Sequence, residues 1–152
     1  MTTNERYRAL RRELDSIPVV DTHEHIYLPE EDYLSLECDF ARFLAHYVID
    51  DLVSAGMPIS NFLEFQETGG AVLRAGGEPL DTEAKWAHIA PYWKEVKETG
   101  YGRSARHAIR KLLDIDDLND ATYQLIGERL RACMKLGVYR RFLKDICGLT
   151  CI

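Results

Sequence analysis

The feature that most constrains this chain is an apolar run that ends in two histidines. Residues 17–26 read IPVVDTHEHI, a short hydrophobic segment typical of a buried strand, and the run closes on His23 and His25. Side chains in a β-strand alternate between its two faces, so we expect both imidazoles and Asp21 on the same face. Two imidazoles at a strand end supply half of a four-coordinate metal site. The alternative interpretation is a pair of histidines in a turn that bond to the backbone.

Downstream of this strand, which we expect over residues 18–22, the hydrophobic pattern is mostly helical. Apolar residues recur at helical spacing, and capping residues stand at the start of several segments. The pattern predicts helices over 2–16, 39–55, 60–65, 81–96, 103–113, 121–134 and 137–145, with weaker helical signals near 30 and at 71–75. Pro91 predicts a kink or a split in its helix, and residues 100–102 (GYG) predict a turn. Residues 149–152 predict a second strand.

Parts of the chain resemble a known family. Residues 19–25 (VVDTHEH) resemble the first-strand signature of the amidohydrolase superfamily, the metal-dependent hydrolases built on a (β/α)8 barrel. Residues 91–93 (PYW) and 99–103 (TGYGR) resemble the branch that contains uronate isomerases and the proteins called amidohydrolase 2. The resemblance covers nearly the whole chain, but only the amino-terminal part of the family's domain.

The resemblance implies an α/β fold, the N-terminal part of a (β/α)8 TIM barrel that is predominantly helical with one or two strands. A complete barrel needs about 250 residues, so we expect the 152-residue chain to be an amino-terminal fragment with the remainder of the barrel absent. Residues 1–152 would form this portion, with about 26–147 as a large helical insertion after the first strand. A fragment should expose apolar surface where the missing barrel would pack.

The resemblance also implies that His23 and His25 bind a divalent metal ion. Zn is the first choice because neutral imidazole suits it, and Mn and Fe are alternatives. In the family the ion activates a water molecule or polarises a substrate oxygen. The other ligands and the general base come from later strands that cannot be matched here, so no catalytic residue is assigned. We expect weak metal binding and no turnover from this chain alone.

Asp21 and a set of arginines are the remaining polar candidates. Asp21 either accepts a ring N–H from a metal-ligating histidine and so fixes its tautomer, or satisfies nearby backbone donors at the strand end. Arg103 and Arg106 lie with Arg110 on one helical face. They are weak candidates for binding a substrate carboxylate, because an arginine stripe is more often a solvated face.

Two further groups have a structural and a functional interpretation. Aromatic residues at helical spacing either line a pocket or, as we favour, form core; they are Trp86, Tyr92, Trp93 and Tyr101. Cys147 and Cys151 are four residues apart and suggest a metal pair, but we favour two small buried residues near a strand, because the chain has no C-x-x-C pair.

Composition excludes several classes of partner. The net charge of −6 argues against nucleic acid, which attracts a basic surface. No apolar run approaches the roughly 20 residues of a membrane span, and residues 1–12 lack the apolar core of a signal peptide. We therefore expect a cytoplasmic protein with reduced cysteines, a small-molecule substrate and no membrane contact, whose full-length form is a homo-oligomer.

Three functions compete on these grounds. The leading hypothesis is a metal-dependent hydrolase that uses metal-activated water on a small carboxylated, amide, ester or lactone substrate. The second is a uronate-isomerase-like sugar-acid isomerase or a decarboxylase on the same scaffold. The third is a non-enzymatic helical interaction module, in which the histidine pair is incidental.

Overall fold

The computed structural model describes residues 2–23, 26, 29–36, 38–45, 47–58, 62–65, 71–75 and 78–151; over 62–65, 71–75 and 78–79 it describes the backbone. The chain divides into two compact units. Unit 1 joins the two ends of the chain, Met1–His25 and Tyr139–Ile152. Unit 2 is the intervening segment, Ile26–Val138.

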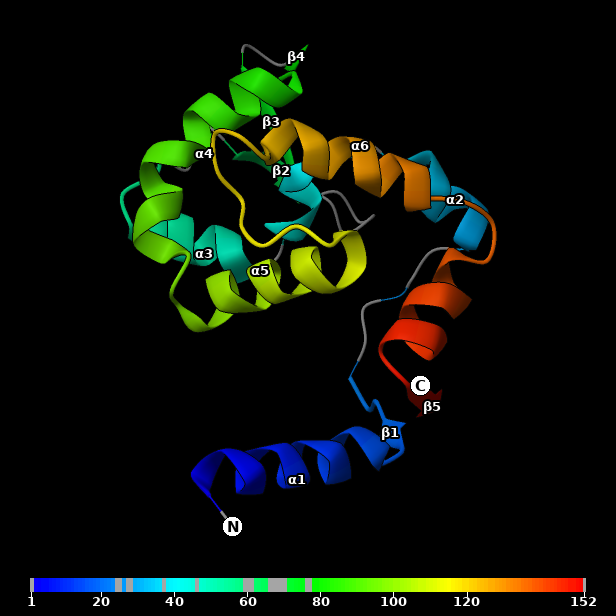
Figure 1. The fold of residues 1–152 in the computed structure, drawn as a ribbon. Helices are drawn as coiled ribbons and strands as arrows, with labels where there is room; N and C mark the ends of the chain where they lie inside the picture. The colour runs from blue at the N-terminus through cyan, green and yellow to red at the C-terminus, as the bar shows by residue number, and fades with distance from the viewer. Residues whose placement is uncertain are drawn as a thin grey trace. The chain divides into compact units, whose positions relative to one another are not determined.

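Unit 1 begins with the helix α1 (Thr3–Ser16), whose start is fixed by a capping box. The Thr2 hydroxyl accepts the backbone N–H of Glu5 at 3.2 Å, and the Glu5 carboxylate accepts the N–H of Thr2 at 2.7 Å. The two bonds satisfy donors that a helix start leaves without an intrahelical partner. α1 is followed by the short strand β1 (Val19–Val20), as Figure 1 shows.

The second half of unit 1 brings a strand beside β1. The π-helix η3 (Arg140–Ile146) is followed by β5 (Leu149–Cys151), and Gly148 between them has the positive φ of 71° that the change of direction needs. β1 and β5 pair in parallel. Residues 21–148, 128 residues in all, separate the two strands, and parallel pairing requires such a crossover. The predicted second strand is confirmed, and so is the coarse expectation of a mostly helical α/β chain.

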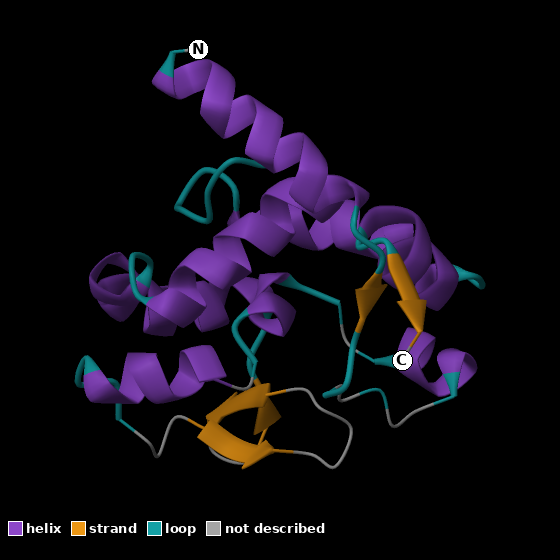
Figure 2. Cartoon of the chain, turned by 90° about the horizontal axis from the view of Figure 1, so that it is seen from below, coloured by secondary structure: helices purple, strands orange, loops and turns teal. Residues whose placement is uncertain are grey.

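A second sheet contradicts the sequence-based expectation for its segment. β2 (Phe62–Phe65), β3 (Ala71–Ala75) and β4 (Glu78–Pro79) form an antiparallel sheet in the order β2-β3-β4. Figure 2 draws the strands in orange. The helices predicted over 60–65 and 71–75 are therefore wrong. Apolar runs of four or five residues do not separate helix from strand by periodicity, and the flanking glycines favour a hairpin.

The other regular elements described in unit 2 are helices. They are α2 (Glu30–Ser35), the 3₁₀ helix η1 (Phe40–Phe43), α3 (Tyr47–Ser54), α4 (Thr82–Val96), α5 (Gly100–Leu113) and α6 (Tyr123–Cys133). The helix predicted over 39–55 is two pieces, because the Asp39 carboxylate accepts the N–H of Ala41 at 2.8 Å and starts a tight 3₁₀ turn. α4 continues through Pro91, so the helix is not split there.

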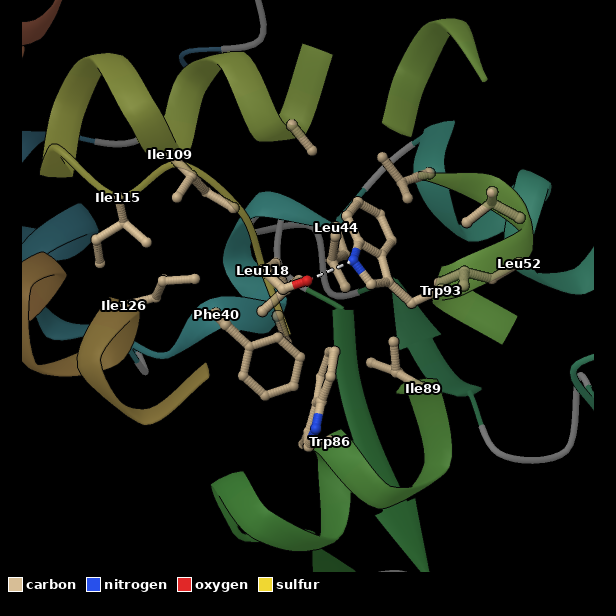
Figure 3. Packing of buried hydrophobic residues seen from close by; sticks show 14 of the residues in the cluster. Phe40, Leu44, Leu52, Trp86, Ile89, Trp93, Ile109, Ile115, Leu118 and Ile126 are labelled. Carbon is tan, nitrogen blue, oxygen red and sulfur yellow. Dashed lines mark hydrogen bonds between the residues drawn. The ribbon is translucent and has the colours of Figure 1, made fainter. Parts of the chain in front are cut away.

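The core of unit 2 is built around two tryptophans of α4 (Figure 3). The indole N–H of Trp93 donates to the carbonyl oxygen of Leu118 at 2.9 Å, so its only polar atom is satisfied inside the core. Trp86 meets Phe40 edge to face with ring centroids 5.4 Å apart. The core interpretation is confirmed for both tryptophans, whereas Tyr101 is exposed.

The junction between α4 and α5 explains the sequence TGYGR at residues 99–103. Thr99 caps α5 by accepting the N–H of Gly102 at 3.1 Å, and its hydroxyl donates to the Asp51 carboxylate of α3 at 2.5 Å. A Cβ at Gly102 would lie 2.1 Å from the carbonyl oxygen of Val96, so only glycine fits there. The predicted turn at 100–102 is wrong, because these residues form the first turn of α5.

A buried ion pair joins three elements of unit 2. The Lys85 ammonium of α4 lies 2.7 Å from the Asp39 carboxylate, and the two side chains are 2% and 4% exposed. Gly127 of α6 packs over this pair, since a Cβ at that position would lie 3.4 Å from the Asp39 Cα. The ion pair links α4 to the start of η1, and the close approach of Gly127 brings α6 against Asp39. Among the described residues, no helix has the length and apolar character to cross a bilayer.

Candidate metal centre

The candidate centre lies where β1 ends. The strand stops at Val20, and the backbone N–H of Asp21 donates to the carbonyl oxygen of Cys151 at 3.0 Å, which extends the parallel pairing by one bond. The Thr150 hydroxyl also donates to the carbonyl oxygen of Val19 at 2.9 Å. The carboxyl ends of both strands therefore meet at one edge of the sheet, which is where parallel α/β folds place their ligands.

Asp21 turns the chain at this edge. Its Oδ1 accepts the backbone N–H of His23 at 3.1 Å, the bond of an Asx turn. The alternation of side chains assumed for a continuous strand therefore ends at Asp21, and His23 lies on the turn with an exposed side chain. His25 lies outside the described residues, so the geometry of the histidine pair is not part of the structure.

The described part of the chain holds no complete metal site. Within it, no group of three or more His, Cys, Asp or Glu side chains is placed to bind one ion. Asp21, His23 and Cys151 thus do not form a donor set by themselves, although their backbones are adjacent. Two histidines would supply only two of the four donors that Zn takes in proteins, so His23 and His25 would fit part of a centre and not a whole one.

The two arginine candidates lie in unit 2 and differ in their surroundings. Arg103 is exposed on α5. Arg106 is held by two carboxylates: its Nη1 lies 2.6 Å from Glu98, and its Nε lies 2.9 Å from Asp117 without the alignment of a hydrogen bond. Lys97 approaches the same Asp117 carboxylate at 3.5 Å. A substrate carboxylate would have to compete with both acids for the Arg106 guanidinium, whereas Arg103 carries no such ion pair among the described residues.

The four cysteines are all free thiols. Cys147 and Cys151 are exposed, so the expectation of two buried residues is wrong for this pair. The turn at Gly148 places Cys147 at the end of η3 and Cys151 at the end of β5, on the outside of a small unit. In unit 2 the half-buried Cys38 thiol accepts a hydrogen bond from Arg42 at 3.0 Å.

Sequence reasoning missed the Lys85–Asp39 pair. The signal that could have revealed it is the position of Lys85 on α4, four residues before Ile89 and eight before Trp93, on the face that is otherwise apolar. A lysine in such a stripe is rarely buried unless it is paired. Asp39 stands at the start of the helix predicted over 39–55, and it caps η1.

Comparison with known proteins adds no assignment. No family model matches the chain. No curated protein and no solved structure matches it either.

Proposed function

We propose that the chain is the amino-terminal part of a metal-dependent hydrolase of the amidohydrolase type, and that His23 and His25 bind its divalent ion. Zn is the first choice, with Mn or Fe as alternatives. In this proposal β1 and β5 are the first two strands of a (β/α)8 barrel, and the segment between them is a helical insertion at the active-site end.

One observation carries the proposal: the sequence VVDTHEH stands at the carboxyl end of a strand whose neighbour is parallel to it. Adjacent parallel strands are the repeating relation of such a barrel, and its active site lies at the carboxyl ends. The bond from the Asp21 N–H to the Cys151 carbonyl shows that the two strands end together. A barrel enzyme would bind its metal at this edge, and the histidine pair directly follows it in the sequence.

In this proposal, Asp21 acts by positioning His23. The Asp21 carboxylate fixes the backbone of His23 by accepting its N–H, and so limits the directions that the imidazole can take. A neutral imidazole then offers one ring nitrogen as a donor. The bound ion would activate water for attack on a small carboxylated, amide, ester or lactone substrate. Two histidines do not complete the coordination, so we expect weak binding and no turnover by this chain alone.

A second candidate is a helical interaction module. It is favoured by the core of unit 2, because every buried hydrophobic side chain in the described part of the chain lies between Phe40 and Val138. A unit with its own core can act without the histidine pair. In that case metal binding would be absent or unrelated to His23.

Metal titration separates the two candidates. Zn binding is measured by calorimetry on the wild-type chain and on His23→Ala, His25→Ala and His107→Ala. His107 is an exposed histidine of α5 and serves as the matched control. We expect one weak Zn site in the wild type. Its affinity should fall at least about tenfold in His23→Ala and in His25→Ala, because each variant removes one of the two imidazole donors. The affinity should be unchanged in His107→Ala. Equal affinity in all four proteins would refute the hydrolase proposal.

A further inference from the structure

Two tyrosines on neighbouring helices of unit 2 stack against each other. The rings of Tyr47 in α3 and Tyr101 in α5 are nearly parallel, with an interplanar angle of 15° and centroids 4.7 Å apart. Neither residue belongs to the buried core, since they are 44% and 47% exposed. Both helices lie in unit 2 and pack against each other, so this aromatic contact is internal to one compact unit.

The start of α5 holds the two rings together. The Thr99 hydroxyl donates to the carboxylate of Asp51, which lies one helical turn beyond Tyr47, and this bond ties the start of α5 to α3. On the other side of Tyr101, Gly102 packs closely against the backbone at the end of α4. The stacked arrangement is therefore supported by contacts of the neighbouring residues and not by the two rings alone.

We propose that Tyr47 and Tyr101 form an oxidative cross-linking site, at which a peroxide joins the two side chains as dityrosine. Each phenol loses one electron and its hydroxyl proton and becomes a phenoxyl radical. The two radicals join through the ring carbons next to the hydroxyls, and the hydrogen on each of these carbons then moves, as a proton, to the phenoxyl oxygen. The peroxide takes up the two electrons and two protons as its O–O bond breaks, so hydrogen peroxide leaves as two water molecules.

Contact between the rings decides which two radicals meet. Groups that are held in contact react far faster than the same groups diffusing in solution. The second ring of the pair already lies against the first, whereas a tyrosine of another molecule must reach it by diffusion. We therefore expect the link within one chain. It is independent of the proposed metal site, because neither tyrosine belongs to unit 1.

The cross-link has a consequence for the stability of unit 2. It joins α3 to α5 covalently and closes the chain between residues 47 and 101. A closed loop reduces the conformational freedom of the unfolded chain, and the stacked rings allow closure without the loss of native contacts. The linked chain should therefore unfold at a higher urea concentration than the unlinked chain, so that oxidation locks unit 2 in its folded form.

Photo-oxidation of the whole chain tests the proposal. A ruthenium trisbipyridine complex, light and peroxodisulfate remove single electrons from phenols. The four free cysteines are reduced again with dithiothreitol before analysis, so that disulfides do not contribute to the mass change. The monomer should be lighter by two hydrogen atoms and show dityrosine fluorescence. After digestion with trypsin, which cuts after Lys and Arg, peptide 43–74 should be linked to peptide 98–103.

Phenylalanine variants separate the chemistry from the packing. Tyr47→Phe and Tyr101→Phe keep an aromatic ring at each position but cannot form the phenoxyl radical. The dityrosine yield in the monomer should fall more than about tenfold in either variant, because no other pair of phenols is held in this contact among the described residues. Tyr7→Phe, on α1, is the matched control and should leave the yield unchanged. The fluorescence of Trp86 and Trp93 before oxidation reports whether each variant is folded.

The outcomes that would overturn the proposal are distinct. One is the absence of dityrosine from the monomer under conditions that couple free tyrosine. Another is dityrosine that occurs only in covalent dimers, and a third is an equal yield in Tyr47→Phe and the wild type. A linked chain that unfolds at a lower urea concentration than the unlinked chain would contradict the stacked geometry.

Discussion

Gly102→Ala should destabilise unit 2, whereas Gly100→Ala, two residues earlier in the same helical turn, should not. An added Cβ at Gly102 would lie 2.1 Å from the Val96 carbonyl oxygen and 2.8 Å from the Lys97 Cα. Both neighbours are backbone atoms, so α5 must move away from the end of α4. Overpacking of this kind costs about 1–3 kcal/mol, and a shifted helix start also weakens the Thr99 cap, worth about 1 kcal/mol.

Gly100 is the control because a Cβ there meets no heavy atom within 4 Å. Alanine is favoured over glycine in helices by up to about 1 kcal/mol, so Gly100→Ala should be neutral or slightly stabilising. The expected separation between the two variants is about 2–4 kcal/mol in the free energy of unfolding.

Urea titration followed by tryptophan fluorescence measures this separation, since both tryptophans lie in the core of unit 2. Gly102→Ala should unfold at a clearly lower urea concentration with an unchanged slope. Two variants whose unfolding free energies agree within about 0.5 kcal/mol would show that α4 and α5 do not meet as described, because additive helix propensity alone predicts equal gains.

Three further substitutions test single contacts by the same titration. Lys85→Met should lower the free energy of unfolding by about 3–5 kcal/mol because it leaves the buried Asp39 carboxylate without its ion-pair partner. A loss below about 1 kcal/mol would indicate that the pair is exposed to solvent. Asp114→Gly should stabilise by up to about 1 kcal/mol, since Asp114 has a φ of 55° at the end of α5; a loss would contradict that conformation. Asp81→Ala should cost about 1 kcal/mol because its carboxylate accepts the N–H of Ala84 at 2.8 Å, and no change would mean that α4 starts elsewhere.

The parts of the fold that follow from local chemistry were predictable. The capping box of α1, the start of α4 at Asp81 and the strand at the end of the chain all rest on patterns of a few neighbouring residues. The pairing of that strand with β1 is observed in the structure. The barrel itself and the metal role remain predictions.

The parts that depend on contacts between distant segments were not predictable. Gly100 and Gly102 look like a turn, and only the approach of the Val96 carbonyl explains why α5 carries glycine at position 102. Residues 62–65 and 71–75 form strands because they pair with each other, which a short apolar run does not encode. At the candidate site, the Asx turn at Asp21 ends the alternation that the strand pattern predicted.

The pairing of β1 with β5 has a consequence for biosynthesis. With 128 residues between the strands, a ribosome that adds about 5–20 residues per second makes β5 roughly 6–26 s after β1. The whole of unit 2 is translated within that interval, so its core can close before β5 is available to pair with β1. β1 therefore pairs with β5 only after the segment that forms the core of unit 2 has been made.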